Sequence, residues 1–201
     1  LEDYRPLHSQ KALLRNKLKF PKNKIIFIHT GSLYKGGGDY FEYILNFRKI
    51  YFLHIGGEDK ECQYWQKYYI SNGYNNIHFK SHLPHDLIVK YQIAADALFY
   101  INSRRSKIFW YTSPLKVFEY MSTGNPILGS NTGSVSEILS PINCFCFDPD
   151  NRESISRAVQ SLLESKVNRN RIAQNALENV KEKYTWDARV ISIVKFLNNV
   201  N

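Results

Sequence analysis

The chain has 201 residues and contains little cysteine, little methionine and no long apolar run. Its three cysteines are too few for a disulfide scaffold, and no nearby Cys or His pattern completes a metal site. No stretch approaches the roughly 18 apolar residues that a membrane span needs. The N-terminus lacks both an initiating Met and the apolar segment of a secretory signal. We therefore expect a cytoplasmic protein with reduced thiols, and we interpret the chain as a piece of a longer one.

Acidic residues are also scarce, with 18 Asp and Glu against 27 Lys and Arg, which gives a formal net charge of +9. Such an excess favours an anionic partner: a phosphate ligand, an acidic membrane surface or nucleic acid. The 43% of hydrophobic residues suffices for a buried core and excludes a disordered chain. The aromatic residues lack the interleaving with basic residues that is typical of RNA-binding sheets, so nucleic acid is not expected.

Short apolar runs alternate with segments of helical periodicity along most of the chain. This alternation predicts an α/β fold, a Rossmann-like doubly wound parallel sheet of about six strands. We expect one domain over residues 1–201, with a lead-in at 1–23 and a helical tail at 167–201 that packs back on the sheet. The pattern is helical only from Arg152 onward, with helix boundaries expected near residues 167 and 185. Ligands of such sheets bind beyond the carboxyl ends of the strands. The expected strands are 24–30, 49–57, 76–83, 95–101, 125–131 and 143–149.

A glycine-rich turn follows the first expected strand. Gly31 is succeeded by Lys35 and by the triplet 36–38, whose amides could approach a phosphate closely beside the lysine charge. The dinucleotide fingerprint G-x-G-x-x-G does not occur at this place. The competing interpretation is that these glycines only form a turn, and their spacing alone favours it.

Residues 113–124 predict a helix whose N-terminus faces an anion. Residues 112–113 can cap it, and Pro114 suits its first turn. The amides of Leu115 and Lys116 then point outward at the positive end of the helix dipole, and Lys116 adds a full charge. A structural ion pair between Lys116 and Glu119 is the alternative interpretation.

Several segments resemble one protein family in their order and spacing. These are GSLYKGG after the first strand, the block from Asn76 to Tyr100, the core SPLKVFEYMSTGNPILGSNTGSVSEIL, and KYTW at 183–186. The chain is similar over nearly its full length to the C-terminal, donor-binding domain of retaining, GT-B-fold, group 1 family glycosyltransferases. This resemblance implies one half of a GT-B fold.

The resemblance also implies a function. The domain binds a nucleotide-diphosphate sugar, and the intact enzyme transfers that sugar to a glycan or lipid-linked acceptor in polysaccharide biosynthesis. The acceptor site lies on an N-terminal domain missing from this chain, so the chain alone is expected to be inactive or nearly so. No metal or other cofactor is implied. The enzyme is expected in the cytoplasm, where an anionic membrane surface at the inner face is a further candidate partner.

The family's motif can be placed on individual residues. Two glutamates separated by seven residues characterise it; Glu119 matches the second, which binds ribose, and Tyr111 stands in the place of the first. Lys116 then offsets the diphosphate charge, so the candidate catalytic residues are Tyr111, Lys116 and Glu119. The candidate donor-binding residues are Gly31, Ser32, Lys35, Gly36, His82, Leu83, Ser113, Pro114, Leu115, Lys116 and Glu119. Ser32 takes a position at which the family often has Arg, and His82 and Leu83 correspond to backbone contacts with the nucleobase.

Three further motifs could have a function, but each also has a purely structural interpretation. Asp148-Pro149-Asp150 is a candidate metal motif, but a helix cap at Asp150 or Asn151 is favoured. The basic loop with Arg104, Arg105 and Lys107 faces an anionic acceptor or is a solvated loop. Histidines 29, 54 and 78 lie in apolar runs, which favours structural roles.

Two other functions remain open at this point. A nucleotide-sugar epimerase shares the fold and acts on the same class of ligand. A non-catalytic basic module would bind nucleic acid or an anionic membrane, and its binding would depend steeply on salt.

Overall fold

The computed structural model describes residues 1–32, 38–104, 109–111 and 115–199. Its centre is a six-stranded sheet in the order β3-β2-β1-β4-β5-β6, in which every neighbouring pair is parallel. The predicted Rossmann-like sheet is thereby confirmed. The strands are β1 (Ile25–Thr30), β2 (Ile50–Ile55), β3 (Ile77–Lys80), β4 (Ala97–Tyr100), β5 (Ile127–Ser130) and β6 (Phe145–Phe147).

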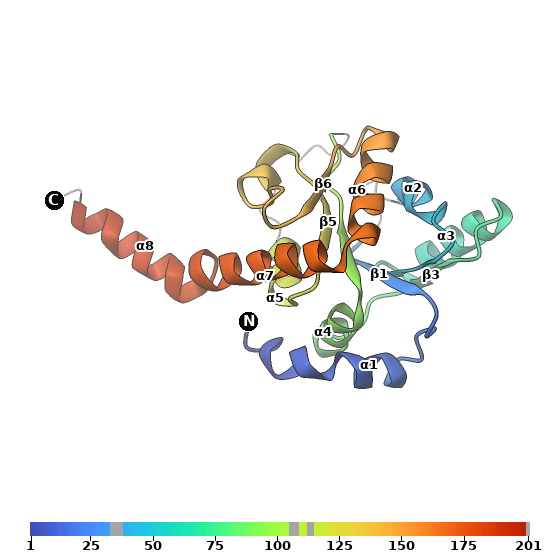
Figure 1. Ribbon diagram of the computed structural model, residues 1–201, viewed down its shortest axis with the longest axis horizontal. Helices are drawn as coiled ribbons and strands as arrows, with labels where there is room; N and C mark the ends of the chain where they lie inside the picture. The colour runs from blue at the N-terminus through green and yellow to red at the C-terminus, as the bar shows by residue number, and fades with distance from the viewer. Residues whose placement is uncertain (33–37, 105–108, 112–114, 200–201) are drawn as a thin grey trace.

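Helices cover both faces of this sheet (Figure 1). Buried side chains of α2, α3 and α6 form one core with Phe27 and Phe52, and those of α4, α5 and α7 form a second core with Ile26 and Ile28. Successive strand residues thus point into opposite cores, which explains why the strands are apolar throughout. The helices concerned are α2 (Glu42–Leu45), α3 (Asp59–Ser71), α4 (His85–Ala94), α5 (Leu115–Ser122), α6 (Arg152–Glu164) and α7 (Lys166–Lys183). The 3₁₀ segments η2 (Gly38–Phe41) and η3 (Gly133–Glu137) lie in loops after β1 and β5.

The strand order reverses between β1 and β4, because β2 and β3 extend the sheet on one side and β5 and β6 on the other. In open α/β sheets, ligands bind in the crevice that such a reversal leaves beyond the carboxyl ends. The chain after β4 leads to α5, so α5 begins at this same edge.

The N-terminal segment forms η1 (Arg5–Gln10) and α1 (Lys11–Lys17), and it packs on α4 (Figure 1). Tyr4 and Leu14 are buried there with residues of α4. The guanidinium of Arg15 lies 2.6 Å from the carboxylate of Asp96, which also accepts a hydrogen bond from the amide of Ile26 at 2.9 Å. The segment is therefore tied to the first strand of the sheet.

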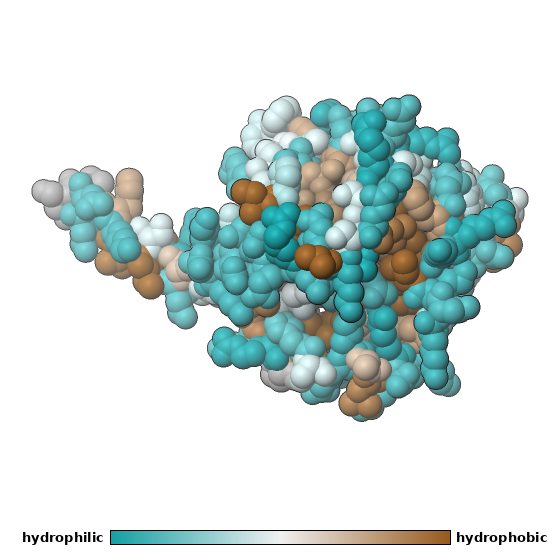
Figure 2. All heavy atoms as spheres, viewed as in Figure 1, coloured by the Kyte–Doolittle hydropathy of each residue, from teal (hydrophilic) through white to brown (hydrophobic). Residues whose placement is uncertain are grey.

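The predicted tail is helical, with boundaries close to the expected residues 167 and 185, but only part of it packs back on the domain. Helix α7 buries side chains that include Ala176 and Val180 against the core beside α5. The following helix, α8 (Trp186–Asn199), buries no residue and extends away from the domain (Figure 1). The expectation of a packed tail is wrong for α8, because the helix continues past the edge of the sheet. Its apolar side chains lie exposed (Figure 2).

Candidate functional site

The residues that follow β1, β2 and β3 lie side by side at one edge of the sheet. The amide of Gly31 after β1 donates to the carbonyl of Ile55 at 2.8 Å, and the amide of Gly56 after β2 donates to that of Lys80 at 2.9 Å. The amide of His82, which follows β3, donates to the carbonyl of Gly57 at 3.1 Å. Two of the predicted donor-binding residues, Gly31 and His82, are therefore brought to the same edge.

Gly31 packs against groups that leave no room for a side chain. It has a φ of +125°, a conformation that favours glycine, and a Cβ atom there would collide with the Nζ atom of Lys116 on α5. Gly56, with a φ of +139°, lies so close to Gly31 that a Cβ atom would collide with the backbone of Gly31. The two glycines thus bring the first two strand ends together and place the Lys116 ammonium against the backbone after β1.

Helix α5 is held to β1 by the residue next to Glu119. The buried hydroxyl of Tyr120 accepts a hydrogen bond from the amide of Thr30 at 2.8 Å and lies 3.1 Å from the hydroxyl oxygen of Thr30. Burial raises the pKa of Tyr120, with a smaller contribution from the charge of Glu119. The bond fixes the part of α5 that carries Lys116 and Glu119 beside the end of β1.

Two buried histidines lie directly behind this edge. His29 and His54 are neighbours in the β1–β2 register, their rings are stacked, and their Nδ1 atoms are 2.9 Å apart. Nε2 of His54 lies 3.1 Å from the carbonyl of Gly56, so it must donate that hydrogen bond. Its Nδ1 is then the acceptor, and Nδ1 of His29 donates to it.

Both imidazoles are neutral in this arrangement. Burial, with a smaller contribution from the charge of Lys116, lowers the pKa of His54 to about 4, although its hydrogen bond to the carbonyl of Gly56 acts in the opposite direction. Burial, followed by the charges of Lys116 and then His54, lowers the pKa of His29. The structural role predicted for these two histidines is confirmed. His78 is also structural, since its ring stacks on Tyr51 at 4.3 Å.

The loop after β3 lies beside two adjoining hollows. Leu83, which packs against the second core, lines a cavity of about 470 Å³ between α3 and β3 together with Phe79. His82 and Gly57 line a neighbouring hollow of about 520 Å³. Both residues predicted for the nucleobase therefore border open space at the strand edge.

Ser32 follows Gly31 and has an unsatisfied side chain. Its hydroxyl oxygen is buried, yet it makes no hydrogen bond within the described part of the chain. Buried hydroxyls are normally paired, so this hydroxyl is available to a further hydrogen-bonding group.

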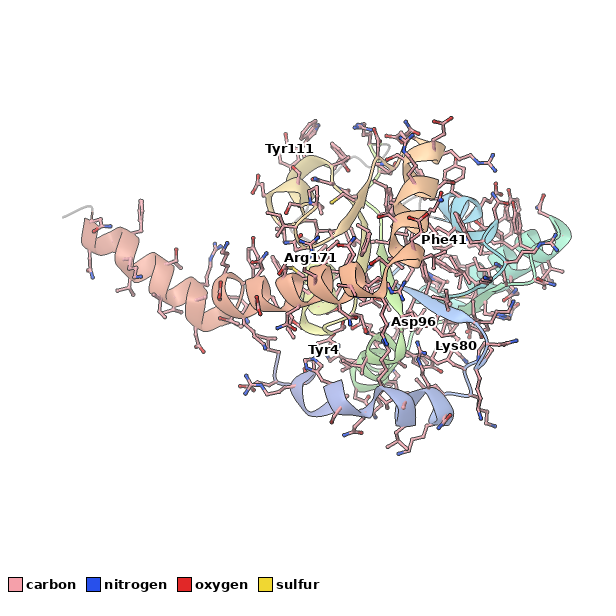
Figure 3. The ribbon with its side chains drawn as sticks, viewed as in Figure 1. Tyr4, Phe41, Lys80, Asp96, Tyr111 and Arg171 are labelled. Atoms are coloured by element: carbon pink, nitrogen blue, oxygen red, sulfur yellow. The ribbon has the colours of Figure 1, made fainter. Side chains whose placement is uncertain are left out.

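Tyr111 and Leu115 are two predicted site residues that lie largely exposed. Tyr111 has 86% of its surface exposed and projects from the loop after β4 (Figure 3), while Leu115 at the start of α5 is 71% exposed. Lys35, Gly36, Ser113 and Pro114 lie outside the described residues, as do the predicted cap positions 112–113.

The acidic motif at 148–150 serves the structure. The guanidinium of Arg104 lies 2.6 Å from the carboxylate of Asp148 and 2.9 Å from that of Asp150. Asn151 caps α6 by accepting a hydrogen bond from the amide of Ser154 at 3.0 Å, which confirms the cap interpretation. Arg104 is therefore not a simply solvated loop residue, because it ties the loop after β4 to the start of α6. Among the described residues, no group of three or more His, Cys, Asp or Glu could hold a metal ion.

A family of known proteins matches most of the chain. The glycosyl transferase-like family matches residues 45–195. The chain belongs to this family. An uncharacterized glycosyltransferase of Methanocaldococcus jannaschii is 36% identical over 70 residues, which cover 34% of this chain and 18% of that protein. The predicted kinship to glycosyltransferases is thus confirmed.

Solved structures of glycosyltransferases share the fold. HepE of Anabaena, in a complex with UDP-glucose, matches with a TM-score of 0.74 and 18% identity over 95% of this chain and 53% of HepE. The C-terminal domain of LpcC, a group 1 family protein of Francisella tularensis, matches with a TM-score of 0.69 and 18% identity over 88% of this chain and 93% of that domain. The fold is therefore that of a GT-B glycosyltransferase domain. The chain spans about half the length of HepE.

Sequence reasoning missed the residues that hold the site together. Gly56, Thr30 and Tyr120 are essential to the geometry, but none stands out by charge or motif. The glycine that ends each of the first two strands was the available signal for Gly56, and adjacency to Glu119 was the signal for Tyr120.

Proposed function

We propose that this chain binds the nucleoside diphosphate sugar donor of a retaining glycosyltransferase. The contact that carries the proposal is that between Lys116 and Gly31, which holds an ammonium group at the carboxyl edge of the sheet beside the start of α5. The family membership and the shared fold support it, and the UDP-glucose complex of HepE shows that one protein of this fold takes such a ligand.

The chemistry of glycosyl transfer suits this arrangement. As the bond between sugar and phosphate breaks, negative charge grows on the β-phosphate of the leaving nucleoside diphosphate. The Lys116 ammonium and the positive end of the α5 dipole would stabilise that charge more strongly in the transition state than in the bound donor. In this proposal, side chains and a helix supply the positive charge, with no metal ion.

Other residues of the edge would hold the nucleoside and the sugar. The carboxylate of Glu119 would accept hydrogen bonds from ribose hydroxyls, and the unpaired hydroxyl of Ser32 would bond to a phosphate oxygen. His82 and Leu83 would border the base, since both line the hollows beside the edge. Tyr111 would contact the sugar from its exposed position after β4.

A second domain would supply the acceptor site. The chain covers only 53% of HepE, and α8 exposes apolar side chains that a partner would cover. These exposed residues are Trp186, Val190, Ile191, Ile193, Val194, Phe196 and Leu197. We therefore expect negligible transfer by this chain alone and retention of configuration in the intact enzyme. Appreciable transfer by the isolated chain would contradict the need for a second domain.

In this proposal, the acceptor is a glycan or a lipid-linked sugar. The enzyme would act in the cytoplasm, in polysaccharide biosynthesis. The net charge of +9 favours an anionic membrane surface as a secondary partner. No described helix is long and apolar enough to cross a bilayer. Co-sedimentation with vesicles of increasing anionic lipid content tests the membrane contact, and binding that ignores that content would contradict it.

Calorimetric titration with UDP, GDP and ADP, beside uridine, guanosine and adenosine, tests the donor site directly. We expect one diphosphate to bind selectively and more tightly than its nucleoside. Failure of both the folded chain and the full-length enzyme to bind any diphosphate would overturn the proposal. Release of an epimerised nucleotide sugar without an acceptor would instead identify an epimerase.

A further inference from the structure

A buried hydrogen bond joins the N-terminal segment to α4. Tyr4 is only 3% exposed, and its hydroxyl donates to Oε1 of Gln92 at 2.6 Å. Gln92 lies on α4 and is fully buried. Burial raises the pKa of Tyr4, so its hydroxyl keeps the proton that this bond needs.

The bond is the first of a chain that reaches the candidate donor site. Nε2 of Gln92 donates to the hydroxyl oxygen of Thr30 at 3.2 Å. The amide of Thr30 donates in turn to the hydroxyl of Tyr120 at 2.8 Å. Tyr4, Gln92, Thr30 and Tyr120 thus form a continuous path through the N-terminal segment, α4, β1 and α5. All four residues are buried.

The far end of this path flanks the residues that the proposed function uses. Thr30 immediately precedes Gly31, and Tyr120 immediately follows Glu119. The Lys116 ammonium lies against Gly31, the residue next to Thr30. Any change in the bond between Thr30 and Tyr120 therefore changes the spacing between the end of β1 and the part of α5 that carries Lys116.

Packing alone does not account for four polar groups in a core. Apolar side chains of similar volume would fill the same space without the cost of removing polar groups from water. A buried polar network instead selects one arrangement, since breaking any bond leaves its partner unsatisfied in a medium of low dielectric. Here the selected arrangement is the position of α5 relative to β1.

We infer that Tyr4 is a positioning residue for the donor site, acting through Gln92 and Thr30 on Tyr120. The N-terminal segment then helps to position the nucleotide site, and it also packs against α4. This inference rests on the proposed function for its ligand, but the hydrogen-bond path can be tested without any ligand.

The ligand-free test uses Tyr4→Phe, which removes the hydroxyl and keeps the ring. We expect the amide of Thr30 to exchange its hydrogen faster in the variant, because its acceptor on Tyr120 is less firmly held. Tyr100→Phe is the matched control: Tyr100 is also a buried tyrosine of the second core, and its hydroxyl makes no hydrogen bond with the described residues. Unchanged exchange at Thr30 in Tyr4→Phe would overturn the inference.

The ligand test uses the diphosphate among UDP, GDP and ADP that the unmodified chain binds best. We expect Tyr4→Phe to lower its affinity about 3- to 10-fold, the equivalent of one buried hydrogen bond. Tyr100→Phe should leave the affinity unchanged. Since Tyr4 acts on the placement of Lys116, the same change should have little effect in a Lys116→Ala background.

The outcomes separate this inference from the proposed function. If the unmodified chain and the full-length enzyme bind no diphosphate, the proposed function fails, and hydrogen exchange at Thr30 still decides the path. If the diphosphate binds but Tyr4→Phe costs the same in both backgrounds, Tyr4 is merely structural and the positioning role is wrong.

Discussion

The Nζ atom of Lys116 lies against the Cα atom of Gly31, in the space that a side chain on any other residue would occupy. The two residues come from α5 and from the turn after β1, at the point where the strand order reverses. Gly31 therefore has two roles, since it accommodates a positive φ and makes room for an ammonium group.

Alanine substitutions at three glycines should separate backbone strain from steric collision. Gly31, Gly56 and Gly73 all have positive φ, but only Gly73 has open space around a Cβ atom. We expect Gly73→Ala to lower the free energy of unfolding by about 1–2 kcal/mol through strain alone. Gly56→Ala should cost about 3 kcal/mol or more, because its Cβ atom would meet the rigid backbone of Gly31.

Gly31→Ala should behave differently from both. Its Cβ atom would meet the flexible end of Lys116, which can move aside, so the stability loss should be smaller than that of Gly56→Ala, where φ is similar but the neighbour is backbone. Diphosphate affinity should nevertheless fall in Gly31→Ala and stay unchanged in Gly73→Ala. Urea denaturation and calorimetric titration of the three variants measure the two quantities. Equal affinity in Gly31→Ala and the unmodified chain would separate Gly31 from the ligand.

Lys116→Ala and Glu119→Gln should weaken the binding of different parts of the ligand. Loss of the ammonium should lower diphosphate affinity about 10- to 100-fold and leave the nucleoside nearly unaffected, as expected for a lost charge-assisted bond. Glu119→Gln keeps the shape of the side chain, and it should weaken diphosphate and nucleoside by the same factor, about tenfold. Equal losses for both ligands in Lys116→Ala would remove Lys116 from the phosphate role.

The buried histidine pair should make the fold sensitive to acid. The pKa of His54 is lowered to about 4 and that of His29 is also lowered, whereas the unfolded chain has histidines near pKa 6.5. Between these values the unfolded chain binds more protons, so stability is complete above pH 6.5 and falls as the pH drops toward 4. The expected slope is about 1.4 kcal/mol per pH unit for each histidine.

Urea titrations between pH 4.5 and 7.5 measure this slope. His54→Gln should reduce it, because one of the two protonations disappears. His85→Gln is the control, since His85 is exposed on the first turn of α4 and lies outside the pair. A slope that does not change when His54 is replaced would contradict the assignment of the acid sensitivity to this pair.

Replacing Tyr111 should weaken the binding of the sugar and leave the binding of the nucleotide unchanged. Tyr111 is 86% exposed, and in the proposed function it contacts the donor sugar. We expect Tyr111→Ala to leave the affinity for the preferred diphosphate unchanged and to weaken the corresponding diphosphate sugar about 3- to 10-fold. Trp110→Ala, at a neighbouring exposed aromatic, is the control. Equal affinity for the diphosphate sugar in Tyr111→Ala and the unmodified chain would contradict a sugar contact.

Much of the candidate site could be predicted from local chemistry. Gly31 and Lys116 stand out because a glycine after a strand and a charge at a helix start are local signals, whereas Glu119 was predicted from the family resemblance. The buried path from Tyr4 to Tyr120 gave no such signal, since it joins single residues of four separate elements. The pairing of His29 with His54 also depends on the register of two strands, which periodicity alone does not determine.

The sequence by itself determined the parallel six-stranded sheet, the helix boundaries near residues 167 and 185, and the family to which the chain belongs. These follow from hydrophobic periodicity and from motifs that act over a few residues. Only the tertiary structure decided that Lys116 meets Gly31, that Arg104 pairs with Asp148, and that α8 extends away from the domain. Each of these depends on how distant segments pack, and an amphipathic helix has the same periodicity whether or not a surface lies within its reach.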